Sequence, residues 1–209
     1  PGYADPVQGP WMMEQMLKQA EHVGAEIVSD LVTDVELSKR PFTVTTDSGA
    51  IWTCDALIVA TGAQAKWLGI PSEKEFMGFG VSACATCDGF FYRGENVIVV
   101  GGGNTAIDCV RVVLREGAED SILVYRRTRK EMPAESYEVD DAEEENVQFE
   151  FLRNPTRLIH ENGKVVGVEV VVMELGEPDE SGRRRPAPVP GSEYVIPCDL
   201  VIPAIGQDP

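Results

Sequence analysis

Two cysteines separated by two residues are the strongest chemical feature of this sequence. Cys84 and Cys87 enclose Ala85 and Thr86, and the carboxylate of Asp88 follows directly. Thiols at this spacing can close a small disulfide ring, in which one thiolate attacks a disulfide and the other resolves the mixed intermediate. We expect the pair at a helix start, because a helix N-terminus lowers the pKa of a thiol. The sequence therefore predicts a redox-active dithiol, with Cys84 and Cys87 as the reacting groups and Asp88 as the proton carrier.

Half of a zinc site is the alternative interpretation of the cysteine pair. A structural zinc ion needs two more ligands at suitable spacing, and the histidines, His22 and His160, are single and far away in sequence. The other cysteines (Cys54, Cys109 and Cys198) lie singly in apolar or strand-like stretches. An odd number of cysteines in a chain of this length does not indicate a secreted disulfide framework. We favour redox chemistry and assign no metal.

A glycine turn follows the cysteine pair at residues 97–106 (VIVVGGGNTA). An apolar strand over residues 96–100 enters the turn, a helix over residues 106–116 leaves it, and a second strand covers residues 121–125. A βαβ unit of this size is typical of one half of a dinucleotide-binding domain. Its glycines allow a tight turn and close approach of a pyrophosphate, and the helix N-terminus attracts phosphate. The predicted cofactor contacts are Gly101, Gly103, Asn104, Thr105 and Ala106.

Two arginines end the second strand of this unit. An NAD site favours Asp or Glu at this place, to hold the ribose hydroxyls, whereas Arg suits the additional 2′-phosphate of NADP. A solvated basic loop end is the alternative. Because Arg126 and Arg127 stand where the ribose contact is expected after the glycine turn, we favour NADP.

The remaining chain predicts an α/β protein. Apolar residues at helical spacing predict a core-facing helix over residues 11–23. An apolar run over residues 56–62 predicts a strand buried on both faces, with its end open to a ligand. Glycines bracket an aromatic cluster at residues 88–94, where we place the domain boundary and a hinge. The other expected elements are strands over residues 26–37, 42–46, 51–54, 147–152, 165–175, 194–196 and 199–204, an acidic helix over residues 134–146 and a loop over residues 176–191.

Charge and hydropathy exclude two classes of partner. The chain of 209 residues carries 18 basic and 35 acidic side chains, a net charge of −17. Nucleic-acid binding relies on basic side chains that neutralise phosphates, so we expect no nucleic-acid partner. No apolar run approaches the roughly 20 residues that span a bilayer, so we expect no membrane partner.

The first half of the chain resembles thioredoxin reductase. The matching segments are residues 40–42 (RPF), 54–63 (CDALIVATGA), 81–94 (VSACATCDGFFYRG) and 97–106. The resemblance implies FAD, NADPH, a thioredoxin-like protein disulfide as partner, a cytoplasmic location and a homodimer in the full-length parent. It implies that Cys87 faces the flavin, that Cys84 attacks the partner disulfide and that Asp88 is the acid and base. It places Ala60, Thr61 and Gly62 beside the FAD.

The second half, residues 95–209, is similar to the NADPH-binding part of the glutamate synthase small subunit. The carrying segments are residues 101–111 (GGGNTAIDCVR), 125–133 (YRRTRKEMP), 173–185 (MELGEPDESGRRR) and 204–209 (AIGQDP), which adds Gly206 to the expected cofactor contacts. That family passes NADPH electrons through FAD to iron–sulfur centres. The thioredoxin reductase pattern would place a further arginine at position 131, where Glu131 stands.

Together these observations predict Rossmann-like FAD- and NAD(P)-binding domains of the three-layer ββα type. We expect a partial flavin domain with the dithiol over residues 1–93, truncated at both ends of the flavin fold, and an NADPH-binding domain over residues 94–209. The expected function is an NADPH-dependent flavoprotein disulfide reductase of the thioredoxin reductase type. The alternatives are an electron-input flavoprotein for an iron–sulfur partner and a non-catalytic nucleotide-binding fragment.

Overall fold

The computed structural model describes residues 7–178 and 184–208 of the chain. The chain divides into two compact units, residues 1–60 and residues 61–209. The boundary that we expected between residues 93 and 94 therefore lies inside the second unit. Cys84, Cys87 and the glycine turn share this unit, while the assignment of residues 1–93 to a flavin domain stays a prediction.

The first unit is a helix followed by a small antiparallel sheet. Helix α1 (Gly9–His22) confirms the helical spacing of the sequence, but none of its residues is buried, so the expected packing of its apolar face is not observed. Strand β2 pairs with both β1 and β3, and the β2–β3 hairpin turns where it was expected, at residues 47–49. The strands of this sheet are β1 (Val32–Glu36), β2 (Phe42–Thr46) and β3 (Ile51–Cys54).

A parallel sheet of order β12-β5-β6-β7 forms the centre of the second unit. Its β5–α3–β6 segment is the predicted βαβ unit, and Gly117 ends the helix with a left-handed φ of 103°, as the sequence indicated. The sheet and its helices are β5 (Asn96–Val100), β6 (Asp120–Tyr125), β7 (Gln148–Phe151), β12 (Leu200–Pro203), α3 (Asn104–Glu116) and α4 (Ser136–Glu144). The acidic helix expected over residues 134–146 is α4, confirmed within two residues at each end.

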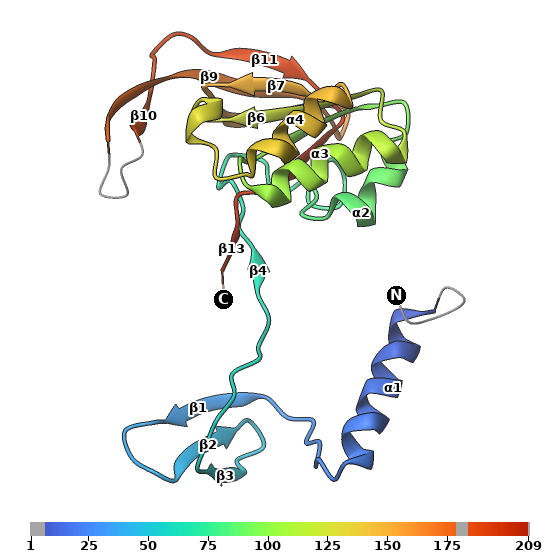
Figure 1. Ribbon diagram of the computed structural model, residues 1–209, viewed down its shortest axis with the longest axis vertical. Coiled ribbons are helices and arrows are strands. Elements are labelled where there is room, and N and C mark those ends of the chain that lie inside the picture. Colours follow the sequence, from blue (N-terminus) through green and yellow to red (C-terminus); the bar gives the residue numbers. More distant parts are fainter. Residues whose placement is uncertain (1–6, 179–183, 209) are drawn as a thin grey trace. The chain divides into compact units, whose positions relative to one another are not determined.

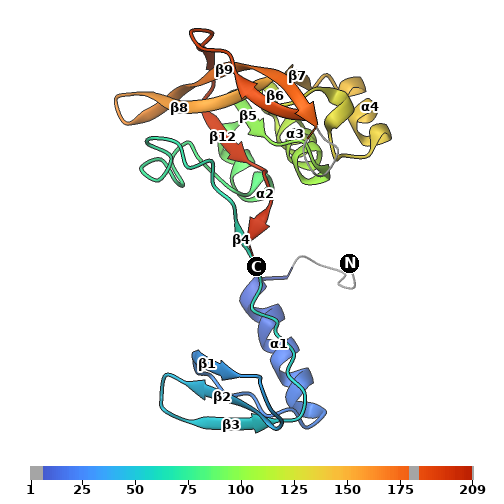
Figure 2. The ribbon, with the colours of Figure 1, turned by 90° about the vertical axis from the view of Figure 1, so that its left-hand side faces the viewer.

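Alternating side chains of the parallel sheet build two separate cores, because successive residues of a strand point to opposite faces. Val97 and Val99 of β5 pack with the helix layer of α3 and α4. Ile98 and Val100 of the same strand pack with a second sheet. The three layers, ββα, are therefore those expected, and Figures 1 and 2 show the helices on one face of the parallel sheet and the second sheet on the other.

The second sheet contains strands that the sequence did not reveal. Strand β9 pairs with β8, β10 and β11, all antiparallel. Strand β8 was not expected at all, and β10 lies in the stretch that we expected to be a loop. The bounds are β8 (Arg153–Glu161), β9 (Lys164–Pro178), β10 (Arg184–Pro188) and β11 (Tyr194–Pro197).

The short elements before β5 pack on α3. Helix α2 (Ala85–Asp88) and the 3-10 turn η1 (Gly89–Tyr92) contact this helix, and Nε of Arg93 donates to the carbonyl of Glu116 at 2.8 Å. The segment over residues 88–94, expected as a hinge between domains, is thus anchored inside one unit. A further 3-10 turn, η2 (Arg129–Glu131), follows β6.

The strand expected over residues 56–62 is wrong. These residues form no strand, and the side chain of Ile58 is 89% exposed. A strand becomes buried only when neighbouring strands pair with it, and among the described residues none does. The next strand is β4 (Gln64–Ala65), which pairs antiparallel with β13 (Gln207–Asp208). Each of these two strands is only two residues long.

Candidate redox and nucleotide-binding site

The two cysteines of the motif are joined by a disulfide bond. Their Cα atoms lie 5.2 Å apart. Cys84 is the N-cap of α2 and is half-buried, whereas Cys87 lies in the helix and is exposed. The expected position at a helix start is therefore confirmed, although α2 is a single turn and supplies only a small part of a helix dipole.

Local hydrogen bonds fix the position of Cys84. The backbone N–H of Cys87 donates to Sγ of Cys84 at 3.1 Å. The hydroxyl of Ser82 accepts from the N–H of Cys84 at 3.0 Å and donates to its carbonyl. An N–H directed at sulfur stabilises a thiolate more than a thiol. When the disulfide is reduced, this arrangement favours negative charge on Cys84.

A small cavity lies next to the disulfide motif and is lined by Asp88 and two aromatic residues. Asp88 is half-buried and lines a cavity of about 270 Å³ with Ser82, Phe91 and Tyr92 among others. Burial, and then the charge of Asp88, raise the pKa of the Tyr92 phenol, which therefore stays protonated near neutral pH. The ring of Phe90 meets that of Phe91 edge to face, with centroids 5.8 Å apart.

The three glycines of the turn at the end of β5 differ in the space around them. A Cβ on Gly101 would lie 2.4 Å from the carbonyl oxygen of Ala204 and 2.9 Å from Cβ of Ala106. A Cβ on Gly102 would lie 2.3 Å from the ring of Tyr125. These two glycines permit close internal packing. A Cβ on Gly103 would lie 3.9 Å from Cγ of Pro133, an ordinary van der Waals distance, so of the three glycines only Gly103 has space beside it.

The start of α3 presents backbone N–H groups that can bind an anion. Gly103 is the N-cap, and no side chain of the described residues caps this end of the helix. Asn104 is not available for that purpose, because its side-chain oxygen accepts from the N–H of Glu135 at 2.9 Å and so ties α3 to the segment before α4. The first N–H groups of a helix have no partner within it and attract phosphate. Together with the space at Gly103, this arrangement fits the pyrophosphate of a dinucleotide.

Most of the predicted nucleotide contacts line one cavity of about 450 Å³ at the carboxyl ends of β5, β6 and β12. Gly101, Gly103, Thr105, Arg126, Arg127 and Gly206 line it, whereas Asn104 and Ala106 do not. Ala106 is fully buried against the sheet, which is the packing role that the sequence assigned to it. Parallel α/β sheets bind dinucleotides at this edge, where the strand order reverses.

The two arginines after β6 differ in their surroundings. Arg126 is exposed, and Arg127 is only 6% exposed, with its Nε donating to the carbonyl of Arg184 in β10 at 2.9 Å. The described lining of the cavity contains no Asp or Glu, although acidic residues outnumber basic ones almost twofold in the chain. The electrostatics therefore suit an additional phosphate better than a ribose diol.

Sequence reasoning missed further residues of this cavity, among them Leu68, Gly102, Tyr125, Arg153 and Asn154. Arg153 and Asn154 follow β7 with only Leu152 between them, and Arg126 and Arg127 come directly after β6. A polar pair after a strand of the parallel sheet was the available signal. This signal does not suffice by itself, because the position of the pair beside Arg126 and Arg127 depends on the order of β6 and β7 in the sheet.

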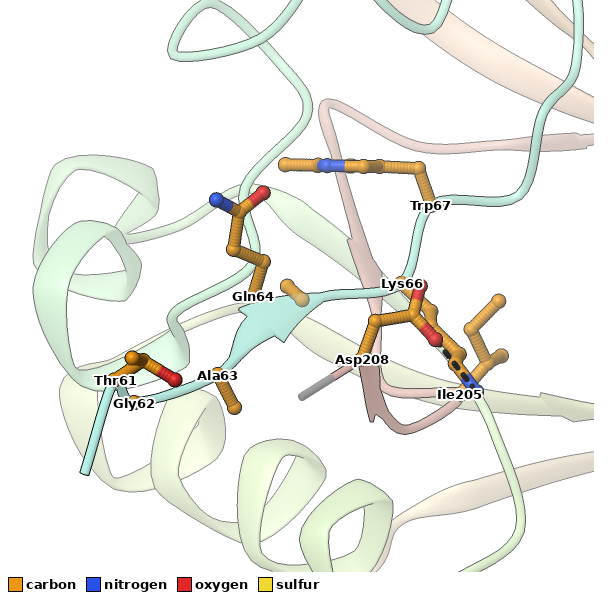
Figure 3. A pocket seen from close by; sticks show the side chains of 9 residues that line it. Thr61, Gly62, Ala63, Gln64, Lys66, Trp67, Ile205 and Asp208 are labelled. Atoms are coloured by element: carbon orange, nitrogen blue, oxygen red, sulfur yellow. Dashed lines mark ion pairs between the residues drawn. The ribbon is translucent and has the colours of Figure 1, made fainter. Parts of the chain in front are cut away.

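A second cavity, of about 760 Å³, surrounds the ladder of β4 and β13. Thr61, Gly62, Gln64 and Trp67 line it, and Nζ of Lys66 pairs with a carboxylate oxygen of Asp208 at 3.0 Å (Figure 3). Thr61 and Gly62 thus border an open space, whereas Ala60 ends the first unit and is exposed.

A flavin fits these residues only in part. Thr61 and Gly62 offer an edge for it, but among the described residues the turn at Gly101 is the only glycine-rich turn between a parallel strand and a helix. We therefore derive no step through a bound flavin.

Two other cysteines, Cys109 and Cys198, are free thiols and so differ from the disulfide pair. Burial raises the pKa of the Cys198 thiol to about 12, and burial also raises the pKa of Cys109. Both thiols are therefore protonated near neutral pH and poor nucleophiles. Within the described ranges, no three His, Cys, Asp or Glu side chains gather as metal ligands, and no helix there is long and apolar enough to cross a bilayer.

Comparison with known proteins identifies the family of the chain. The sequence pattern of the family described as pyridine nucleotide-disulphide oxidoreductase matches residues 6–209. The chain is 59% identical over 165 residues to the NADPH-Fe(3+) oxidoreductase subunit beta of Geobacter sulfurreducens, covering 74% of this chain and 24% of that protein. It is 56% identical over 127 residues to the thioredoxin reductase of Rickettsia conorii, covering 61% of this chain and 41% of the relative.

A solved structure supports the fold over the whole chain. The thioredoxin reductase of Lactococcus lactis superposes with a TM-score of 0.74 at 25% identity, covering 100% of this chain and 63% of that one. The chain thus spans less than two thirds of each of these proteins.

Proposed function

The chain belongs to the pyridine nucleotide-disulphide oxidoreductase family, and we propose that it acts as an NADPH-dependent flavoprotein disulfide reductase of the thioredoxin reductase type. The observation that carries this proposal is the Cys84–Cys87 disulfide in the same compact unit as a dinucleotide cavity. When bound, NADPH and FAD supply a hydride and relay its electron pair. The residues of this chain hold the nucleotide and carry out the thiol chemistry.

The chemistry of the cysteine pair follows from the balance of electrons and protons. Two electrons and two protons convert the Cys84–Cys87 disulfide into two thiols. The thiolate of Cys84, stabilised by the N–H of Cys87, attacks a partner disulfide and forms a mixed disulfide, and one partner sulfur leaves as a thiolate. The thiolate of Cys87 then attacks Sγ of Cys84. This step releases the second partner sulfur and closes the Cys84–Cys87 bond again.

In this proposal Asp88 is the general acid and base of the thiol–disulfide exchange. It follows Cys87 in the chain and lines the neighbouring cavity of about 270 Å³. A carboxylate next to the dithiol can take the proton from an attacking thiol and return it to the leaving thiolate.

The coenzyme of the proposal is NADPH. Gly103 and the uncapped start of α3 receive the pyrophosphate, and Arg126 and Arg127 lie at the next strand end, where the 2′-phosphate of the ribose is expected. The name of the relative from Geobacter sulfurreducens refers to NADPH.

A protein disulfide is the proposed electron acceptor, because an apolar surface lies beside the dithiol. The side chain of Phe91 is 75% exposed, and that of Phe90 is 51% exposed. Exposed aromatic side chains are costly in water and are common anchors of protein interfaces.

Phe91→Ala should therefore raise the KM for a thioredoxin-like protein about fivefold to tenfold. The rate with a small aromatic disulfide, which needs no such surface, should change less than twofold. Steady-state kinetics with both acceptors measure the two effects. Tyr137→Ala on α4 removes a comparably exposed ring and should change neither; an equal loss with both acceptors in Phe91→Ala would argue against the docking role.

A second candidate function is electron input to an iron–sulfur or ferric acceptor. The 59% identity to the NADPH-Fe(3+) oxidoreductase subunit beta favours it. The stretches matched by this relative and by thioredoxin reductase overlap, because their shares of the chain together exceed its length. The fusion of two family parts, the homodimer and the cytoplasmic location stay predictions.

One anaerobic experiment separates the two functions. The protein is incubated with FAD and NADPH, and then receives either a thioredoxin-like disulfide or a ferric acceptor. Disulfide reductase activity requires that NADPH loss equals the formation of partner dithiol and stops when Cys84 and Cys87 are alkylated. Electron input to iron continues after alkylation. Failure to oxidise NADPH with either acceptor would leave a nucleotide-binding module without activity.

A further inference from the structure

We propose that Arg153 is a third phosphate-binding residue of the nucleotide cavity and helps to select the 2′-phosphate. The inference rests on the proposed NADPH function and assigns a role to a residue on a strand that the sequence did not predict. Arg153 begins β8 and lines the same cavity of about 450 Å³ as Arg126 and Arg127.

The order of the parallel sheet places Arg153 toward the adenosine half of the nucleotide. The glycine turn follows β5, Arg126 follows β6, and Arg153 comes after β7, with the strands in the order β5-β6-β7. A dinucleotide that lies across these strand ends has its pyrophosphate at the glycine turn and its adenosine ribose at the next strand. Arg153 therefore lies on the side of the 2′-phosphate and away from the nicotinamide.

The backbone before Arg153 turns sharply and brings the residue to the cavity. Leu152 adopts a left-handed φ of 57°, which is unfavourable for a side chain of this size. Its N–H donates to the carbonyl of Arg127 at 3.1 Å, and its carbonyl accepts from the N–H of Met173 at 2.8 Å. These bonds join the segment of Arg127 to the segment of Arg153, so the two arginines are held by one backbone connection.

Neighbouring groups hold the guanidinium of Arg153. Nε donates to the hydroxyl of Tyr194 at 2.6 Å, and Nη1 donates to the carbonyl of Leu152 at 3.0 Å. The carboxylate of Glu150 lies 3.7 Å from Nε and is partly exposed. Within the described parts of the chain, Nη2 of Arg153 has no hydrogen bond. A guanidinium held on one side and open on the other loses little side-chain entropy when it binds a phosphate.

The charge of the cavity also favours an anion. Three arginines line it, and its described lining includes no carboxylate. Their positive charge attracts a 2′-phosphate, which carries about −1.5 to −2 near pH 7. Glu131, which stands where the resembling pattern has another arginine, is occupied in a capping box with Thr128. Arg153 supplies the third positive charge from a different strand.

Two adenosine ligands test the role of Arg153 without flavin or electron transfer. Isothermal titration measures binding of adenosine 2′,5′-bisphosphate and of adenosine 5′-monophosphate to the whole chain. The wild-type protein should bind the bisphosphate at least about tenfold more tightly. Arg153→Met should reduce this preference about fivefold or more and leave binding of the monophosphate within twofold. Arg153→Lys, which keeps the charge, should restore part of the preference.

Arg157→Met is the matched control, because Arg157 lies on the same strand, pairs with Glu169 at 2.9 Å and does not line the cavity. It should retain the wild-type preference. If Arg153→Met does not fold, the inference is tested with Arg153→Lys and Tyr194→Phe. Tyr194→Phe removes only the hydroxyl that accepts from Nε of Arg153. If both variants keep the wild-type preference for the bisphosphate, the inference is overturned.

The outcomes separate this inference from the function on which it rests. A wild-type protein that binds both ligands equally overturns the proposed NADP preference, and the inference with it. A wild-type preference that persists within twofold in Arg153→Met overturns only the role of Arg153. An equal loss of both ligands in Arg153→Met identifies a structural role and also overturns it.

Discussion

Cys84→Ser and Cys87→Ser should each reduce NADPH-dependent disulfide reduction at least about 1,000-fold, because neither cysteine alone can complete the exchange cycle. With Cys84 replaced, no thiolate is left at the position that the N–H of Cys87 stabilises. With Cys87 replaced, a mixed disulfide on Cys84 has no resolving thiol. The two variants should therefore fail at different steps.

Mass spectrometry of the stalled proteins distinguishes these steps. Cys87→Ser should accumulate a covalent adduct with the partner through Cys84, and Cys84→Ser should accumulate much less. The control is Cys54→Ser in the first unit, where the thiol is remote in sequence from the pair and half-buried; it should retain the wild-type rate. Full activity in either variant of the pair would remove the dithiol from the mechanism, and an unchanged rate with a ferric acceptor would favour the second candidate function.

Gly103→Ala should weaken NADPH binding and Gly101→Ala should destabilise the fold, although the two glycines are only two residues apart. A methyl group on Gly103 would lie 3.9 Å from Cγ of Pro133, an ordinary van der Waals distance, and the φ of −95° at this position suits any residue. The folded protein should lose less than about 1 kcal/mol. The methyl group would occupy the space that a pyrophosphate needs, so the affinity for NADPH should fall at least about 100-fold.

Gly101→Ala should instead damage the fold. Its methyl group would lie 2.4 Å from the carbonyl oxygen of Ala204, which belongs to the backbone after β12. Forcing these elements apart should cost about 1–3 kcal/mol or more in the free energy of unfolding. Urea denaturation and fluorescence titration with NADPH measure the two quantities. If Gly103→Ala binds NADPH with wild-type affinity, the turn does not receive the pyrophosphate.

The sequence by itself determined the local chemistry of this protein. The spacing of Cys84 and Cys87 sets whether a disulfide can close, and the run from β5 through Gly101 to α3 specifies a strand, a turn and a helix. These features depend on neighbouring residues and on regular periodicity, so each could be predicted without knowing the rest of the chain. Arg126 and Arg127 could be placed for the same reason, at the end of the next strand.

Only the tertiary structure decided which distant residues share a site. It packed the cysteine motif on α3 in the unit of the nucleotide cavity, and it left residues 56–62 exposed because no described strand pairs with them. It also brought Arg153 to Arg127 and directed the side chain of Asn104 to the start of α4. Such placements depend on strand order and on hydrogen bonds between residues far apart in sequence, and residue type and spacing do not encode them locally.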